Sequence, residues 1–229
     1  MTERAVGLIA GLSVNAGIFY YQELARRHKD AGVPLDLLLA HADLGTVLSF
    51  VSGGDARGLA RYFSVLIDRL KAGGCSAIAI TAVAPHICIH ELREVSESPI
   101  IDILSLIRDF ISDSLPYERV AILGNKAVVQ TNIYGSVDKS RVVTPPESIV
   151  EQIHMVYNDI ALLGKRGSEE EYCLLEELAE ELMGLGADAL LLAGTDLSSF
   201  YKWRPAGYPC IDLAQLHLAA IANYTGAAQ

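Results

Sequence analysis

The chain has 229 residues, of which 51% are hydrophobic and 20% are charged, and its formal net charge at pH 7 is −10. This composition is typical of a globular protein with a sizeable core. The acidic balance argues against a nucleic-acid surface, because neutralising phosphates requires clustered lysine and arginine. No apolar run reaches the ~18 residues of a membrane-spanning helix, so we expect no membrane partner.

The cysteines are Cys75, Cys88, Cys173 and Cys210. None of them forms a CxxC pair or a zinc-ligand spacing, so we expect no structural metal. The N-terminal apolar run is too short and too glycine-rich for a secretory signal. Reduced thiols in a cytoplasmic protein are therefore the expectation.

Strand and helix patterns alternate along the first half of the chain. We expect strands over 5–10, 35–40, 77–80 and a short one over 99–103, with helices over 18–28, 59–72, 85–95 and 104–114. The first strand runs into a glycine-bearing turn that contains Ser13 and Asn15, which are candidates for touching a ligand. The alternative is that this turn only connects the strand to the next helix and contacts no ligand.

The loop after the third strand holds Thr81, Ala82, Val83 and Ala84. Ligands bind at the carboxyl ends of strands in open parallel sheets, so this loop is a predicted binding position. Its side chains are nevertheless almost inert. Pro85 follows, where the first turn of a helix tolerates its missing N–H.

The same alternation begins again after a break at residues 115–118. We expect strands over 120–125, 142–143, 187–192 and 208–212, with helices from about 128 and over 149–163, 168–183 and 213–224. Ser168 and Glu171 have the spacing of a capping box. The seven glutamates of that helix are interpreted as a solvated face.

These patterns predict an α/β protein of two similar lobes, each a parallel sheet flanked by helices, with an interlobe cleft. We place the first lobe at residues 1–114 plus 208–229 and the second at 115–207.

Five segments, in order, resemble the aspartate/glutamate racemase superfamily, a PLP-independent group that includes hydantoin racemases. They are GLIAGLSVNAGIFYYQEL, AIAITAVAPH, VAILGNKAVVQTNIY, LLLAGTDLS and PCIDLAQLH. The resemblance covers nearly the whole chain. It implies a small carboxylate or amino-acid substrate, no cofactor and a homodimer.

The resemblance also implies two opposed thiols, one on each lobe, which exchange protons with one carbon. Those two positions fall on Ala82 and Gly194, and neither side chain can accept or donate a proton. The neighbouring family Asn and Thr fall on Val83 and Ala84. Small residues at both positions would enlarge the pocket at the reacting carbon.

Polar groups remain around both positions. Asp196 resembles the family glutamate that partners a thiol, and we take Asp196, His86 and His217 as candidate acid/base groups. Each histidine also has a structural alternative, a hydrogen bond to the backbone. Cys210 lies on the same side of its strand as Asp212 and is an outside candidate for a relocated thiol.

The candidate substrate-binding set combines the glycine-bearing turns with the two strand ends. It comprises Ser13, Asn15, Thr81, Ala82, Val83, Ala84, Asn125, Gly194 and Thr195.

Two functions are compatible with this set of residues. The first is an enzyme with non-cysteine acid/base chemistry, of isomerase, decarboxylase or lyase type. The second is a catalytically inactive homologue that binds an amino acid or dicarboxylate as a sensor or partner protein. Residues 201–204 form an amphipathic segment that we interpret as a surface loop, with a lid as the alternative.

Overall fold

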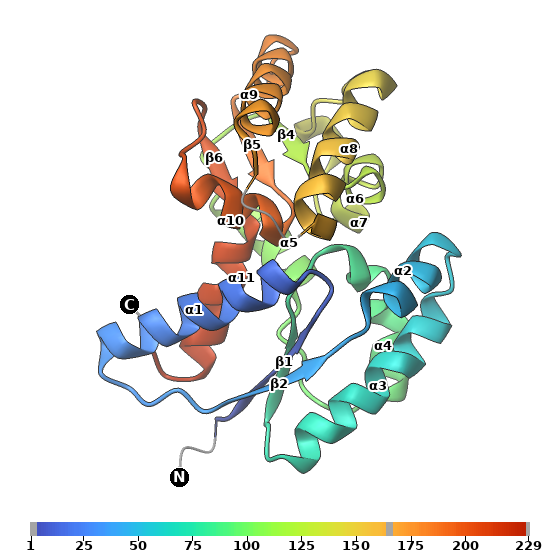
Figure 1. The fold of residues 1–229 in the computed structure, drawn as a ribbon, viewed down its shortest axis with the longest axis vertical. Helices are drawn as coiled ribbons and strands as arrows, with labels where there is room; N and C mark the ends of the chain where they lie inside the picture. Colours follow the sequence, from blue (N-terminus) through green and yellow to red (C-terminus); the bar gives the residue numbers. More distant parts are fainter. Residues whose placement is uncertain (1–3, 164–166, 228–229) are drawn as a thin grey trace. The chain divides into compact units, whose positions relative to one another are not determined.

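The computed structural model describes residues 4–163 and 167–227, and Figure 1 shows their arrangement along the chain. The chain divides into two compact units, one made of residues 1–102 and 216–229 and the other of residues 103–215. Among the described residues, no helix is both long and apolar enough to cross a membrane.

The first unit is built on a parallel three-stranded sheet in the order β2-β1-β3. Its strands are β1 (Val6–Ala10), β2 (Leu37–His41) and β3 (Ala77–Ile80). The central strand β1 is buried along its whole length, and Val6 pairs with Leu37 on one side and Ala77 on the other. A continuous apolar run is what a strand covered on both faces requires.

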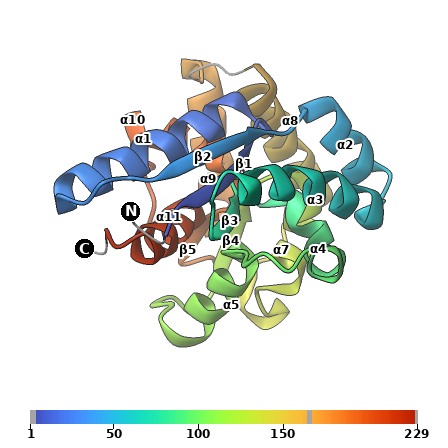
Figure 2. The ribbon, with the colours of Figure 1, turned by 90° about the horizontal axis from the view of Figure 1, so that it is seen from below.

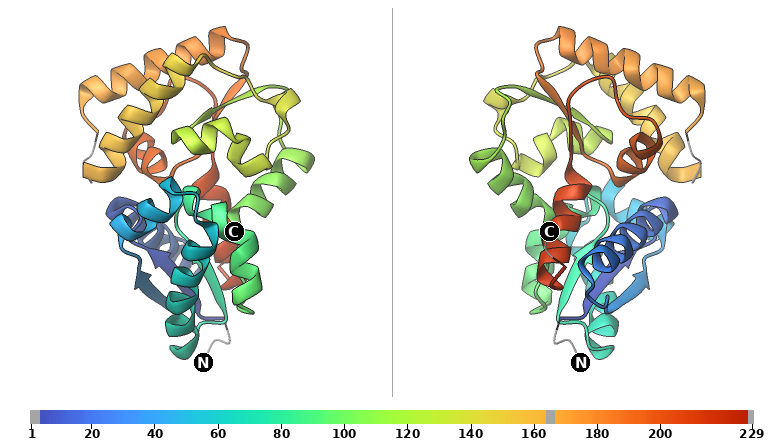
Figure 3. Two further views of the ribbon diagram at one scale, coloured as in Figure 1. Left: turned by 90° about the vertical axis from the view of Figure 1, so that its right-hand side faces the viewer. Right: turned by 90° about the vertical axis from the view of Figure 1, so that its left-hand side faces the viewer.

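Helices cover both faces of this sheet. They are α1 (Val14–Ala31), α2 (Leu44–Ser52), α3 (Ala56–Ala72), the 3₁₀ helix η1 (Ala84–Cys88), α4 (Ile89–Val95) and the end of α11 (Leu213–Tyr224). One face packs against α2, α3 and α4 through a cluster that includes Phe63, Ile78 and Leu92. The two panels of Figure 3 show these helices on one side, and α1 and α11 on the other. Figure 2 shows α3 running beside β1, β2 and β3.

The second unit repeats the design with the parallel order β4-β5-β6. Its strands are β4 (Val120–Leu123), β5 (Ala189–Leu192) and β6 (Cys210–Asp212). Its helices are α5 (Ile103–Asp113), α6 (Lys126–Gln130), α7 (Asn132–Gly135), the 3₁₀ helix η2 (Lys139–Arg141), α8 (Glu147–Leu163), α9 (Glu169–Gly184) and α10 (Thr195–Trp203). Side chains of α8, α9 and α10 form one core with β4 and β5, including Ile153, Leu178 and Leu197. The predicted fold class, two parallel sheets flanked by helices, is confirmed.

The ends of several helices follow the local signals in the sequence. Ser168 and Glu171 form the predicted capping box at the start of α9. Pro85 lies in the first turn of η1, where its missing N–H costs nothing. Gly74, which follows α3, has φ +96°, a conformation that favours glycine.

Other predictions of local structure were wrong. The sequence patterns missed α2 and α10, and the predicted strands at 99–103 and 142–143 are single bridges, from Ile100 to Ile78 and from Val142 to Val120. Residues 201–203, expected in a loop, are the last turn of α10. A short apolar stretch beside turn residues can form a strand, a helix or a loop, and tertiary packing decides which of them forms.

The observed units also differ from the boundaries placed from the sequence. β6 hydrogen-bonds to β5, so residues 210–212 belong to the second sheet and not to the first lobe. The helix α5 is likewise part of the second unit, where Arg141 Nη1 donates to the Ile111 carbonyl at 2.8 Å. Strand pairing and long-range hydrogen bonds decide these boundaries.

The segment after α6 is a left-handed turn. Asn132, Ile133 and Tyr134 all have φ between +50° and +56°, although Ile133 is β-branched and fully buried. Such a conformation costs about 1–2 kcal/mol per residue. The turn is held by Thr131 Oγ1, which accepts from the Tyr134 amide at 3.0 Å, and by the burial of Ile133.

Candidate active site

The loop after β3 is fixed by its own hydrogen bonds. Both the amide and the hydroxyl of Thr81 donate to the Ile9 carbonyl, at 3.1 and 3.3 Å, and Thr81 is completely buried. Thr81 therefore ties β3 to β1. Ala82 and Ala84 are partly exposed and Val83 is buried, so this strand end presents methyl groups at the predicted binding position.

His86 is buried beneath this loop, with 1% of its surface exposed. Its Nδ1 lies 2.8 Å from the Ala82 carbonyl oxygen and must therefore carry the proton of that bond. Its Nε2 is buried without a hydrogen-bond partner among the described residues. Burial lowers the pKa of His86, opposed by the carboxylate of Asp102, which in turn accepts from Arg93 Nη2 at 2.6 Å. His86 is thus a neutral imidazole that holds the Ala82 carbonyl.

His217 has partners on both ring nitrogens. Its Nε2 donates to the Ile101 carbonyl at 2.7 Å, so Nδ1 is the acceptor for the Tyr20 hydroxyl at 2.9 Å. Burial, with the neighbouring His86, lowers the pKa of His217 to about 3. A neutral imidazole with both nitrogens bonded to the scaffold does not serve as a general acid at neutral pH, which fits a structural role.

The turn after β1 is a helix start. The Ser13 hydroxyl caps α1 by accepting from the Ala16 amide at 3.4 Å, and Asn15 lies partly exposed in the first turn. Gly11 has φ +101°, and a Cβ there would lie 2.4 Å from the Ala42 carbonyl oxygen. Only glycine allows this close approach between the strand ends of β1 and β2.

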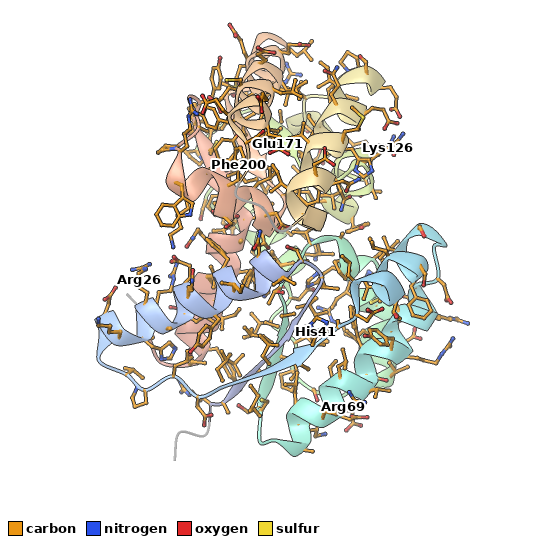
Figure 4. All side chains as sticks on the ribbon, viewed as in Figure 1. Arg26, His41, Arg69, Lys126, Glu171 and Phe200 are labelled. Carbon is orange, nitrogen blue, oxygen red and sulfur yellow. The ribbon has the colours of Figure 1, made fainter. Side chains whose placement is uncertain are left out.

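The turn after β4 repeats this construction. Asn125 caps α6, its side chain accepting from the Val128 amide at 3.0 Å. The next amide, that of Lys126, donates to His154 Nδ1 at 3.2 Å, while Lys126 Nζ pairs with Glu147 at 2.6 Å and also with Glu151. Figure 4 shows Lys126 beside α8. These protein contacts occupy the first turn of α6.

The candidate residues at the end of β5 are buried. Gly194, Thr195 and Asp196 are buried, and Asp196 lies in the first turn of α10 with 3% of its surface exposed. The ring of Tyr157, from α8, covers Gly194. A Cβ at residue 194 would lie 2.3 Å from Tyr157 Cε2 and 2.9 Å from its hydroxyl.

Burial raises the pKa of the Tyr157 hydroxyl, and the nearby charge of Asp196 raises it further, so this group is a neutral phenol. The expectation that small residues enlarge the pocket at both positions is therefore wrong at Gly194. A tyrosine ring from another helix fills that space.

The remaining candidates take other roles. Asp212 Oδ1 accepts from the Ser198 hydroxyl at 2.7 Å and from the Ala214 amide at 2.9 Å, so it caps α11. Burial, Glu176 and Asp212 raise the pKa of the Cys210 thiol to about 11, so Cys210 does not provide a thiolate at neutral pH. Within residues 4–163 and 167–227, no three His, Cys, Asp or Glu side chains are grouped as ligands for a metal ion.

Tyr157 is the site residue that sequence reasoning missed. It lies 37 positions before Gly194, in a helix recognised only by its apolar periodicity. The one feature of the sequence that pointed to a side chain filling this space was Gly194 itself. Its backbone is extended, with φ −161° and ψ 128°, so the glycine is required for space and not for conformation.

Comparisons with known proteins agree with this fold of two parallel sheets flanked by helices. The sequence profile of the Asp/Glu/hydantoin racemase family matches residues 9–221. The chain belongs to this family. A search of curated proteins finds no match.

Solved structures of this family share the fold. A candidate Asp/Glu racemase from Yersinia pestis superposes with a TM-score of 0.80 at 20% identity, covering 97% of this chain and 99% of that one. An aspartate racemase homologue from Pyrococcus horikoshii gives 0.75 at 16% identity, covering 97% and 99%. The aspartate racemase of Picrophilus torridus gives 0.74 at 20% identity, covering 97% and 94%.

Proposed function

We propose that this protein acts on a small carboxylate or amino acid by acid/base chemistry that uses no cysteine pair. The proposal rests on family membership together with the residues at the two strand ends. Ala82 and Gly194 carry no group that transfers a proton, whereas a carboxylate remains two residues after Gly194.

The observation that carries the proposal is the burial of Asp196 in the first turn of α10. Removing a carboxylate from water is costly, so a buried one needs compensating partners. Here the N-terminal end of α10 favours the negative charge. A buried carboxylate is costly for a fold to keep without a use, so we take Asp196 as a functional group.

The other candidates take supporting roles in this proposal. His86 holds the Ala82 carbonyl, and His217 stabilises the scaffold through Tyr20 and Ile101. The candidate positions for binding a substrate carboxylate are, in the first unit, the turns that contain Ser13, Asn15 and residues 81–84. In the second unit they are the turns that contain Asn125, Gly194 and Thr195. We further propose that the protein is a cytoplasmic homodimer that works without PLP.

Hydrogen exchange in deuterated water tests the function. L-Aspartate, D-aspartate, L-glutamate and malonate are each incubated with the protein, and the α-proton signals are followed by NMR. We expect exchange on at least one probe, and its loss in Asp196→Asn. Asp138→Asn is the matched control, because Asp138 caps η2 in the same unit and its side chain accepts from the amide and hydroxyl of Ser140. Equal exchange in the wild type and Asp196→Asn would contradict the role of this carboxylate.

Binding without turnover is the second candidate, favoured by the apolar side chains at positions 82–84. In that case the same probes would raise the melting temperature, with no exchange on any of them. Light scattering on the purified protein tests the homodimer, and its absorption spectrum tests the absence of PLP.

A further inference from the structure

The outer edge of the first sheet is free along β2. We infer that β2 is a self-pairing edge, at which two copies of this chain join antiparallel about a two-fold axis and form one continuous sheet. This inference rests on the proposed homodimer and assigns a surface to it. It is independent of the chemistry proposed at the strand ends.

The unpaired backbone groups of β2 are the first argument. The Val6 amide donates to the Asp36 carbonyl at 3.1 Å, which fixes the side of the strand that faces β1. Because hydrogen bonding alternates along a parallel strand, the amides and carbonyls of Leu37, Leu39 and His41 point away from β1. Within the described part of the chain, these outward groups have no hydrogen-bond partner.

The other edges of the two sheets are covered or short. On the far side of the first sheet, the Ile78 amide donates to the Pro99 carbonyl at 2.9 Å, and the Ile78 carbonyl accepts from the Ile101 amide at 2.8 Å. In the second sheet, β4 has a bridge to Val142, and β6 has three residues. The strand β2 has five residues and no charge, which is the kind of edge that pairs with another strand.

The strand is complementary to itself in one register, and this selects a second copy as the partner. A two-fold axis at Leu39 sets this residue opposite its own copy and sets Leu37 opposite His41 of the second copy. Each outward amide then meets an outward carbonyl, as in an antiparallel ladder. The pairing also covers the apolar side chains of Leu38 and Leu39, which are 38% and 50% exposed.

The helix α3 runs beside β2 in the opposite direction and brings a positive charge to this edge. The Tyr62 hydroxyl accepts from the Asp43 amide at 2.8 Å, just past one end of β2. At the other end, a Cβ on Gly73 would lie 2.4 Å from Leu38 Cδ1. Arg69 is seven residues after Tyr62 and therefore lies on the same helix face. It is exposed, and Figure 4 shows it on α3.

Asp36 supplies the opposite charge. It is exposed and two residues before Leu38, so its side chain is on the face of the sheet that α3 covers. In the register centred on Leu39, Asp36 of one copy lies opposite Ala42 of the other, beside Arg69 of that copy. Among the described residues, neither Asp36 nor Arg69 has an ion-pair partner in its own chain. Two symmetric pairs of opposite charges thus flank the joined strands and favour this register.

The mass of the protein in solution, measured by light scattering over a range of concentrations, tests the surface. Leu39→Lys sets two ammonium groups opposite one another at the two-fold axis and should give a monomer. Met155→Lys is the matched control, because Met155 is 59% exposed on α8 of the other unit, and it should stay a dimer. A dimeric Leu39→Lys protein would overturn this surface and leave the homodimer standing. A wild type that is monomeric at every concentration would overturn both.

Charge reversal tests the register. Asp36→Arg and Arg69→Asp should each raise the dimer Kd by about 3-fold or more, since each removes two symmetric pairs of exposed charges. The double variant restores opposite charges and should return the Kd toward the wild-type value. Losses that simply multiply in the double variant would contradict the register centred on Leu39.

Amide hydrogen exchange of the unmodified protein gives a measurement that depends on no variant. The Leu37, Leu39 and His41 amides should exchange slowly at concentrations above the dimer Kd and faster below it, because pairing protects them from water. Amides that exchange equally fast in the dimer and the monomer would rule out β2 as the joining edge.

Discussion

Placing a single methyl group on Gly194 tests the packing of the second strand end directly. The Cβ of Gly194→Ala would lie 2.3 Å from Tyr157 Cε2 and 2.9 Å from Cζ, so the ring must move by about 1 Å to restore a contact of about 3.5 Å. Overpacking of this kind costs about 1–3 kcal/mol.

We therefore expect Gly194→Ala to lower the free energy of unfolding by about 1–3 kcal/mol, a large part of the total of a typical domain. Urea denaturation followed by circular dichroism measures it. The cost should persist in the Tyr157→Phe background, where the ring remains. It should disappear in the Tyr157→Ala background, because residue 194 has an extended backbone without strain.

Gly184→Ala is the control for adding a methyl group to a glycine of the same unit. Nothing lies within 4 Å of a Cβ at Gly184, so this change should be neutral or slightly stabilising. A Gly194→Ala protein as stable as the wild type would refute the proposed packing. The same reasoning predicts that Gly194→Cys alone does not restore a working thiol, because Tyr157 occupies its space.

Three further predictions concern stability. Gly11→Ala combines φ +101° with a clash at the Ala42 carbonyl oxygen, whereas Gly32→Ala has φ +68° and nothing within 4 Å of its Cβ. Gly32→Ala should lower the free energy of unfolding by about 1–2 kcal/mol, and Gly11→Ala should lower the melting temperature more than Gly32→Ala does. Equal losses in the two variants would contradict the close approach of the backbone at Gly11. Ser168→Ala removes the N-cap of α9 and should lower the free energy of unfolding, measured by urea denaturation, by about 1 kcal/mol. The folded pKa of His217, about 3, is below its unfolded value, so its contribution is fully present above about pH 6.5 and is lost as pH falls. This residue alone should therefore lower the free energy of unfolding by about 1.4 kcal/mol as the pH falls from 7.5 to 5.5. His217→Gln should lack this contribution to the pH dependence of stability.

The repeated strand pattern predicted the fold because burial on both faces forces a continuous apolar strand, and because glycine and capping residues mark helix ends locally. The runs around Val6, Ile78, Val120 and Leu190 are all strands, and Ser168 caps α9 as its spacing requires. The family was recognisable for the same reason, since its segments coincide with these strand ends.

The site was less predictable than the fold. His86 and His217 are both histidines near helix starts, and the sequence does not separate them. The structure does, because His217 has two bonded nitrogens whereas His86 has a buried Nε2 without a hydrogen-bond partner in the described part of the chain. The cleft that the sequence predicts stays a prediction.

The sequence by itself determined that residues 82 and 194 carry no thiol, because residue identity is all that statement requires. Only the tertiary structure decided what stands at residue 194. A ring from α8 reaches Gly194 across the core of the second unit, a contact between residues 37 positions apart that no local pattern encodes. Local signals fix strands, turns and caps through backbone conformation, whereas the chemistry of this site depends on which distant side chain the packing places beside Asp196.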